Sequence, residues 1–423
     1  MENSFVHLHA HTEYSMLDGA AKIEPFLNRI LELEQPGAAI TDHGNLYGAL
    51  EFYNSAIEKK LKPIIGYEAY VISDSRFERP DRKNNKRYHL TLLAENTVGY
   101  WNLVEMASKA FTEGYYYKPR IDYELLKKYS EGIIALSGCL GGEIAQLLAP
   151  DGSVEEGNQG QTRSFDDALK KAEFYQSIFG ENNFFIELHK HGIKQQEDIL
   201  PDLLKISEKL SAPLVATNDS HYIERGDWQA HELLLNVQSG EPCEIWEKDS
   251  RGQNKQKIPN PKRRVYSSHE LYFKSQEQMA ALFHDVPIAL ENTIAIADKC
   301  SFAFDMQTKH YPVYSNHEEG ISSQDGPKHR EAIAAKLRDL CEEGIVQRYT
   351  PEALACVQAV YPDKDPMDVV RERMEYELGV IVPKGLADYL MIVWDFIHWA
   401  KENQIPVGPG RGSGVGSVIL YLI

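Results

Sequence analysis

Short apolar runs alternate with amphipathic segments from residue 5 to about residue 240, and this alternation constrains the fold more than any other feature of the sequence. The runs are rich in β-branched residues and too short for helices, so we interpret them as strands. The seven predicted strands cover residues 5–11, 38–41, 64–71, 89–94, 133–138, 184–189 and 213–217. Strands separated mostly by helices are typical of parallel β/α units. The sequence therefore predicts an α/β fold with a barrel of β/α units, closed or nearly closed.

The segments between the strands carry apolar residues at helical spacing. The segment after the first predicted strand shows the i, i+3, i+4, i+7, i+8 pattern at Ile23, Phe26, Leu27, Ile30 and Leu31. This pattern predicts a helix with one buried stripe, and residues 194–210 form another such segment. After about residue 285 the β/α alternation ends, and the chain has helical patterns, as at 327–348 and 385–403.

The bulk composition is that of a water-soluble globular protein. A chain of 423 residues exceeds one ordinary core, so we expect one large domain and at least part of a second. No apolar run is long enough for a membrane span and the N-terminus has no signal-peptide pattern, so we expect no membrane contact and a cytoplasmic location.

Five scattered cysteines, an odd number, argue against a disulfide framework. The net charge of −18 disfavours nucleic-acid binding by the whole surface.

Three segments have loop-like composition. Residues 73–88 are charged and almost free of aliphatic side chains, and residues 150–164 are rich in glycine and acids. Residues 248–264 carry seven basic residues against one acid. This third segment is either a solvated surface insertion, the simpler interpretation, or an edge that contacts phosphate.

Polar residues with metal-binding side chains follow several of the predicted strands. His9 and His11 end the first strand, and a period of two places both rings on one face. The others are His43 after the second strand, Cys139 after the fifth, and Asp219 and His221 after the seventh. Barrel enzymes gather their chemistry where strands end and loops begin, and imidazole, carboxylate and thiolate are ligands of zinc and manganese. A lone His-x-His can equally be packed and hydrogen-bonded, but its recurrence with the other motifs favours a metal site.

The motifs HLHAHT, LDG, TDHGN, GYEAYV, HLTLLA, SGCLGGE and ATNDSHY occur in this order. Together they resemble the PHP (polymerase and histidinol phosphatase) domain, in the version found at the N-terminus of bacterial DNA polymerase III alpha subunits. The resemblance implies a distorted seven-stranded β/α barrel with up to three zinc or manganese ions. Carried over by motif, the implied ligands are His9, His11, Asp18, His43, Glu68, His89, Cys139, Asp219 and His221. Glu68 and His89 do not follow strand ends and rest mainly on the family pattern.

The remaining histidines and cysteines have simpler expected roles. We expect His7 to be hydrogen-bonded or to support the ligands rather than to bind metal. His189 and His191 follow the sixth predicted strand, and a place at the rim of the site is the less favoured interpretation of the two. His231 lies in a helical pattern and is most simply a surface or capping residue. The other cysteines, which show no C-x-x-C spacing, are expected to be structural: Cys243, Cys300, Cys341 and Cys356.

The glycine-rich stretch 408–417 precedes an apolar helical run. Glycines allow close backbone approach, and amides at a helix start can bind anions. With the preceding residues, the stretch resembles the start of the palm in the same polymerase family, whose loop is similar to that of polymerase-β-like nucleotidyltransferases. The resemblance implies that Arg411, Gly412 and Ser413 hold the triphosphate of a nucleotide. The family's magnesium carboxylates lie beyond this loop, so we expect residues 1–423 to be the N-terminal part of a longer polymerase.

The leading interpretation is part of a bacterial replicative DNA polymerase, with a PHP domain at 1–285 and the N-terminal portion of the palm at 286–423. The resemblance implies a 3′→5′ exonuclease at the PHP site, DNA primer-template and deoxynucleoside triphosphates as substrates, and a sliding clamp and a separate exonuclease subunit as partners. Magnesium would serve the polymerase site of the full-length protein, so these residues alone would keep at most the exonuclease. The alternatives are a stand-alone PHP phosphoesterase acting on a small phosphate monoester, and a metal-stabilised binding scaffold.

Overall fold

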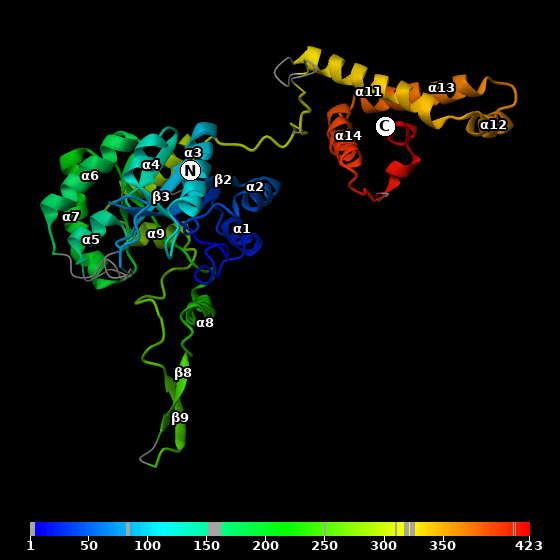
Figure 1. Cartoon of the computed structure of the whole chain (residues 1–423). Coiled ribbons are helices and arrows are strands. Elements are labelled where there is room, and N and C mark those ends of the chain that lie inside the picture. The colour runs from blue at the N-terminus through cyan, green and yellow to red at the C-terminus, as the bar shows by residue number, and fades with distance from the viewer. Residues whose placement is uncertain are drawn as a thin grey trace. The chain divides into compact units, whose positions relative to one another are not determined.

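The structure is a computed structural model that describes residues 5–81, 85–150, 162–248, 251–308, 311–316, 321, 326–408, 410 and 412–423. The chain divides into two compact units, Met1–Phe304 and Asp305–Ile423, shown in Figure 1. The domain boundary that the sequence suggests at residue 285 stays a prediction. Helix α10 (Ile288–Lys299), which follows that position, packs within the first unit. Its residues Ile296 and Ala297 belong to an apolar core that includes side chains of the sheet.

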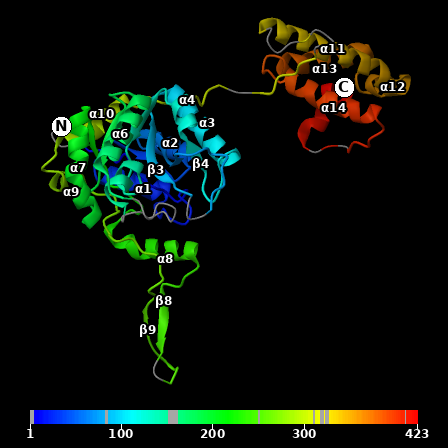
Figure 2. The ribbon, with the colours of Figure 1, turned by 60° about the vertical axis from the view of Figure 1, so that its left-hand side comes forward.

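The first unit is built around a seven-stranded sheet, and the mixed α/β class predicted from the sequence is confirmed. Its strands are β1 (Gly37–Ile40), β2 (Lys62–Ile72), β3 (Tyr88–Ala94), β4 (Arg120–Asp122), β5 (Ile133–Leu136), β6 (Phe184–Leu188) and β7 (Leu214–Ala216). The order is β1-β2-β3-β5-β6-β7, with β4 paired to β2. Figure 2 shows the sheet inside a layer of helices.

Residues 5–11 do not form a regular strand, contrary to the prediction. They make isolated bridges instead, from His7 to Ala38 on one side and from Ala10 to Ser220 on the other. The amide of Ala39 donates to the His7 carbonyl at 2.7 Å, and the amide of His11 donates to the Ser220 carbonyl at 2.8 Å. The segment therefore lies between β1 and the chain that follows β7, and it joins the two ends of the sheet.

The sheet is not wholly parallel as predicted, because β3 runs antiparallel to both β2 and β5. A parallel neighbour needs a long crossover, usually through a helix, whereas an antiparallel neighbour can follow a loop. No helix separates β2 from β3 in the described residues of 73–87. The other pairs are parallel: β1 with β2, β2 with β4, β5 with β6, and β6 with β7.

Helices cover the outside of this sheet. They are α1 (Ile23–Glu32), α2 (Ala49–Glu58), α3 (Thr97–Thr112), α4 (Tyr123–Lys128), α5 (Glu143–Leu148), α6 (Phe165–Phe179), α7 (Lys194–Leu210), α9 (Gln276–Leu282) and α10. Helix α8 (Trp228–Ser239) lies apart from this layer (Figure 1). Four members of the predicted stripe of α1 are buried, but Leu31 is 43% exposed. Helix α7 has the predicted bounds. Buried apolar side chains of α3, α6 and α7 form one core with the sheet.

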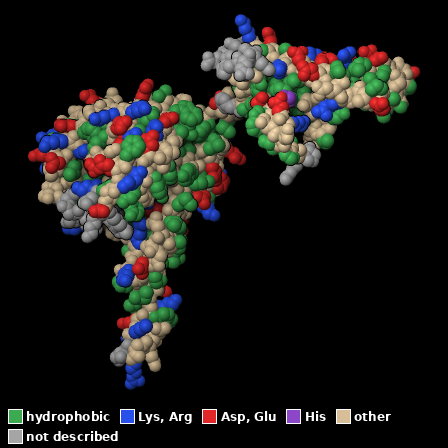
Figure 3. Space-filling view, viewed as in Figure 1, with side chains coloured by type: hydrophobic (Ala, Val, Ile, Leu, Met, Phe, Trp, Pro, Cys, Tyr) green, Lys and Arg blue, Asp and Glu red, His purple; other side chains and the backbone are tan. Residues whose placement is uncertain are grey.

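A two-stranded arm, β8 (Glu244–Lys248) with β9 (Asn254–Pro259), extends from the first unit beyond α8 (Figure 1). Part of the segment predicted as a loop therefore forms a strand. Its side chains are mostly exposed, and Figure 3 shows Lys and Arg at the end of the arm. The arm fits the interpretation of a surface insertion, while its contact with phosphate stays a prediction.

The second unit is largely helical in its described residues, as predicted for this part of the chain. Its helices are α11 (Pro327–Arg348), α12 (Pro351–Val360), α13 (Pro366–Ile381), α14 (Ala387–Glu402) and α15 (Val418–Leu422). Their buried side chains, such as Leu337, Met374 and Met391, form a separate core.

Candidate metal centre

The turn that follows the N-terminal segment is held by one buried carboxylate, Asp42. Asp42 accepts hydrogen bonds from the amide of Thr12 at 2.6 Å and from the hydroxyl of Ser15 at 2.6 Å. The Ser15 hydroxyl also accepts from the amide of His43 at 3.0 Å and contacts His11 Nδ1 at 3.1 Å. These contacts fix the positions of His11 and His43, two of the predicted ligands, relative to the turn.

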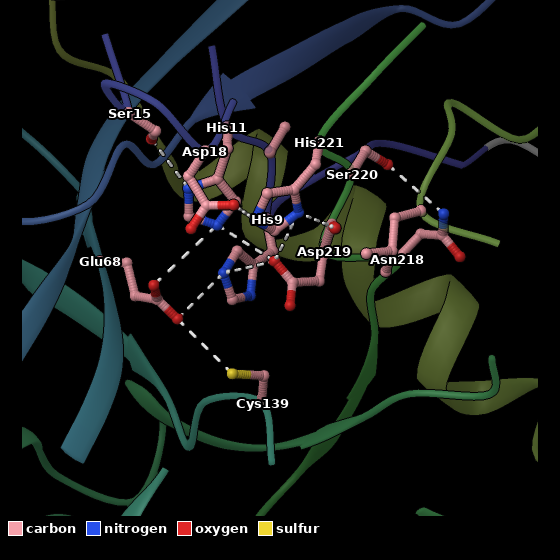
Figure 4. A network of polar contacts seen from close by, with 12 residues as sticks. His9, His11, Ser15, Asp18, Glu68, Cys139, Asn218, Asp219, Ser220 and His221 are labelled. Atoms are coloured by element: carbon pink, nitrogen blue, oxygen red, sulfur yellow. Dashed lines mark hydrogen bonds and ion pairs between the residues drawn. The ribbon is translucent and has the colours of Figure 1, made fainter. Parts of the chain in front are cut away.

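Asp219 lies among three histidines. Its Oδ1 is 3.0 Å from His11 Nε2, 3.4 Å from His9 Nε2 and 3.6 Å from His221 Nδ1. Asp219 has a positive φ of 44°, which aspartate tolerates better than most residues do. Figure 4 shows the side chains of His9, His11 and Asp219 pointing toward one another.

Glu68 of β2 lies among a second group. Its Oε2 is 2.5 Å from His43 Nδ1, and its Oε1 is 2.9 Å from His89 Nδ1 and 3.4 Å from His9 Nε2. Cys139 Sγ lies 3.7 Å from both Glu68 Oε1 and His89 Nδ1. β2 and β3 pair directly, which places Glu68 and His89 near each other within the sheet rather than at strand ends.

Asp18 lies in the turn that follows the N-terminal segment and joins the same cluster. Its carboxylate is 3.5 Å from His43 Nε2 and 3.9 Å from His221 Nε2. The hydroxyl of Tyr266 donates to Asp18 at 3.1 Å, and His231 Nε2 lies 3.6 Å from it. The expectation that His231 is a surface or capping residue is wrong, because α8 buries its ring against Tyr266, beside Asp18.

The structure thus gathers all nine predicted ligands in one place. Among the described residues, four overlapping groups have donor atoms within 4.8 Å of one another: His9, His11 and Asp219; His11, His43 and His221; His43, Glu68 and His89; and His9, Glu187 and His189, the last two of which are not predicted ligands. Within the described part of the chain, His9 Nε2, His11 Nε2, His221 Nε2 and Asp219 Oδ1 are buried and make no hydrogen bond of good geometry. Buried polar atoms are normally partnered, so nitrogen and oxygen donors converging without partners fit divalent cations.

The electrostatics of the cluster favour the metal-binding forms of its carboxylates and of His11. His9 and His43 differ, because neighbouring acidic groups outweigh burial and raise the pKa of each ring well above its ordinary value. Burial alone would raise the pKa of Asp219, but His9, His221 and His11 outweigh it and hold that pKa well below its ordinary value. The pKa of Glu68 is also held well below its ordinary value, because His89 and His43 outweigh its burial. Burial, with the neighbouring imidazoles of His43 and His221, lowers the pKa of His11 to about 3. Ionised carboxylates and neutral imidazole are the ligand forms of these groups.

A cavity of about 250 Å³ gives access to the cluster. Its walls include five predicted ligands, His43, His89, Cys139, Asp219 and His221. His191 also lines it, with Nε2 held by the Asn218 carbonyl at 3.1 Å, whereas His189 does not line it. No Lys or Arg of the described residues lines this cavity.

His7 and His189 lie outside the cluster of unpartnered donors. His7 Nε2 lies 3.0 Å from the Lys274 carbonyl, and burial lowers its pKa to about 3, so this neutral ring donates to that carbonyl. The expected hydrogen-bonded role of His7 is confirmed. His189 is buried and lies 2.6 Å from the Thr217 hydroxyl.

The predicted nucleotide-binding loop belongs to the second unit. Arg411 lies outside the described residues, so the structure gives no position for its side chain. Gly412 has a φ of 87°, and Ser413 begins a short 3₁₀ turn, Ser413–Gly416, in which Ser413 is exposed. Ser417 caps α15 by accepting from the amide of Leu420.

Sequence reasoning missed several residues that contact the predicted ligands. Glu187 contacts His9, while Tyr266 and His231 contact Asp18. Glu187 carries one signal, a charged residue inside the apolar run 184–188 of a predicted strand. Tyr266 and His231 carry none, since neither follows a predicted strand.

The fold and this cluster define a class: an α/β domain with a metal-competent histidine and carboxylate site. Residues 7–191 match the model of the PHP domain family, and residues 335–423 match that of the bacterial DNA polymerase III alpha NTPase domain. The chain is 44% identical to the DNA polymerase III subunit alpha of Chlamydia pneumoniae, over 99% of this chain and 34% of the relative. The corresponding protein of Thermus aquaticus is 37% identical, over 99% of this chain and 35% of that one.

The chain belongs to the bacterial DNA polymerase III alpha subunit family, with a PHP domain followed by the match to the NTPase domain. It spans about a third of the length of these relatives. Among the described residues, no helix is both long and apolar enough to cross a membrane.

Proposed function

We propose that the first unit is a metal-dependent phosphoesterase that releases nucleotides from the 3′ end of DNA, within a replicative DNA polymerase. The observation that carries this proposal is the convergence of nine ligand-type side chains beside an accessible cavity. His9, His11, Asp18, His43, Glu68, His89, Cys139, Asp219 and His221 would hold up to three zinc or manganese ions. When bound, such ions lower the pKa of a water and neutralise charge on phosphoryl oxygens.

The protein's own residues would determine where the ions and the substrate lie. Asp219 and Glu68 each lie among several histidines, so each carboxylate would hold an ion together with those rings. No Lys or Arg of the described residues lines the cavity, so the charge of a phosphodiester there would be neutralised by the ions. His191 and Tyr266, which also line the cavity, are placed to contact the nucleotide.

The wider proposal concerns the polymerase context. In it, residues 286–423 are the first part of the palm, and Arg411, Gly412 and Ser413 contribute to binding the triphosphate of a deoxynucleotide. Membership in the polymerase family supports primer-template DNA as the substrate, a sliding clamp and a separate exonuclease subunit as partners, magnesium at the polymerase site and a cytoplasmic location.

A nuclease assay on a 3′-labelled DNA strand, with manganese or zinc supplied, tests the proposal. We expect the metal-free protein to gain activity on addition of the ion, and His11→Ala and Asp219→Ala each to abolish it. His284→Ala is the matched control, because His284 is exposed in the same unit and its ring contacts the Ala281 carbonyl rather than a predicted ligand. Unchanged nucleotide release in the two site variants would defeat the assignment.

Two parallel measurements separate the alternatives. Hydrolysis of p-nitrophenyl phosphate without any release of nucleotides from DNA would favour a phosphoesterase for small monoesters. A melting temperature that falls on chelation, with no hydrolysis of either substrate, would favour a metal-stabilised scaffold.

A further inference from the structure

Glu187 is a buried carboxylate that belongs to none of the nine predicted ligands. It lies on β6, between β5 and β7, and its side chain has no exposed surface. Its Oε1 is 2.7 Å from His9 Nδ1. An isolated carboxylate is costly to bury, so its contacts must compensate for the lost water.

Those contacts come from donors on three different segments. The hydroxyl of Thr217 donates to Oε1 at 2.5 Å, and the amide of Gly138 donates to Oε2 at 2.9 Å. His189 Nε2 lies 3.1 Å from Oε1. Because a hydroxyl and an amide both donate to its carboxylate, Glu187 is the acceptor in these contacts. His9 Nδ1, which is equally close, therefore donates to Glu187 as well.

Each of these segments carries a predicted metal ligand close by. His9 is itself a ligand, Gly138 directly precedes Cys139, and Thr217 lies two residues before Asp219. One side chain therefore joins the N-terminal segment, the loop after β5 and the chain after β7. It does so from the side of His9 that faces away from the other ligands.

The hydrogen bond to Glu187 also determines which nitrogen of His9 is available. When Nδ1 carries the hydrogen of a neutral imidazole, the lone pair is on Nε2. His9 Nε2 is the atom that lies 3.4 Å from both Asp219 Oδ1 and Glu68 Oε1. A carboxylate behind a ligating histidine fixes its tautomer and ring orientation and increases its affinity for metal.

We propose that Glu187 is the positioning residue of the metal centre, which sets the tautomer of His9 and thereby the affinity for divalent ions. The inference rests on the proposed metal site. It assigns no contact between Glu187 and substrate, and it predicts an effect on metal binding that is measurable without any nuclease assay.

Calorimetric titration of the metal-free protein with zinc tests the proposal. Glu187→Gln keeps the size of the side chain and removes its charge, and we expect zinc affinity to fall about 10- to 100-fold. Glu143→Gln is the matched control, because Glu143 is a buried carboxylate that accepts from Tyr123 and Tyr175 and contacts Lys171 at 3.0 Å, away from the ligands. Zinc affinity should be nearly unchanged in this control. Wild-type affinity in Glu187→Gln, or an equal loss in both variants, would overturn the proposal.

A second measurement does not use Glu187→Gln and so covers the case in which that variant does not fold. In the zinc-loaded protein, nitrogen–proton NMR of the histidine rings should show hydrogen on His9 Nδ1, with the signal assigned from a His9→Gln variant. Hydrogen on His9 Nε2 would contradict the proposal. If the wild-type protein binds no zinc in the titration, the metal centre itself fails, which is a different result from equal binding by wild type and Glu187→Gln.

Discussion

His11 Nε2 lies 3.0 Å from Asp219 Oδ1, although the two residues come from opposite ends of the sheet-forming sequence. The contact depends on residues 5–11, which bridge β1 on one side and Ser220 on the other. Because closure of the sheet and assembly of the cluster use the same segment, disturbing one should disturb the other.

Tyr266→Phe should weaken metal binding with little effect on folding. The variant loses the hydroxyl that donates to Asp18 at 3.1 Å, and loss of such a supporting hydrogen bond typically costs about 10-fold or more in metal affinity. Titration with zinc measures the change. Tyr272→Phe is the control, since its hydroxyl contacts Gln278 rather than a ligand. Equal affinity in Tyr266→Phe and wild type would show that Asp18 needs no such support.

Gly19→Ala should destabilise the turn that carries Asp18. An added Cβ would lie 1.9 Å from the Thr12 carbonyl oxygen, so the backbone must shift. We expect a loss of about 1–3 kcal/mol in the free energy of unfolding, the usual cost of overpacking, together with weaker metal binding. Gly226→Ala is the control, because its Cβ would meet no atom within 4 Å. Urea denaturation followed by circular dichroism compares the two, and equal stability would contradict the prediction.

Glu377→Gln should destabilise the end of the second unit in a pH-dependent way. Glu377 accepts from the Ser417 hydroxyl and contacts Arg373 Nε, both at 2.7 Å. Burial would raise the pKa of Glu377, but these hydrogen bonds outweigh it and lower that pKa below its ordinary value of 4.5. The unfolded chain thus binds the proton more readily. The carboxylate's contribution is fully present above pH 4.5 and is lost as pH falls through the lowered folded-state pKa.

Hydrogen exchange at the Tyr421 amide, which donates to the Ser417 carbonyl, measures this effect. We expect Glu377→Gln to reduce protection by about 1–2 kcal/mol at pH 7, the scale of a hydrogen bond to a charged group, and the difference to shrink in acid. Glu372→Gln on the same helix is the control, since Glu372 is exposed and pairs with Lys364 rather than with Ser417. A difference that persists unchanged below the folded-state pKa would refute the assignment to the Glu377 charge.

Much of the fold and the cluster could be predicted because the signals are local. The apolar runs at β2, β3, β5, β6 and β7 are contiguous, and six of the nine proposed ligands lie where predicted strands end or in the following turn. Strand β4 was missed because its residues, Arg120, Ile121 and Asp122, have no apolar run. Residues 5–11 resemble a strand in composition, but they lie between two sheet ends and make only isolated bridges.

The supporting residues could not be predicted from local patterns. His231 is buried only because α8 packs beside Tyr266, and Glu187 reaches His9 only once the barrel has closed. Both contacts join segments that are distant in the sequence. A helical histidine and a charged residue in a strand have many possible explanations until those segments are placed.

Metal content is the most direct test of the central claim that the nine side chains form one divalent metal site. The purified protein should be stripped with chelator, dialysed against manganese or zinc, and measured by elemental analysis beside a His11→Ala/Asp219→Ala double variant. The account predicts stoichiometric metal in the wild-type protein and a large loss in the variant. Wild-type protein that retains no more metal than the double variant would contradict it.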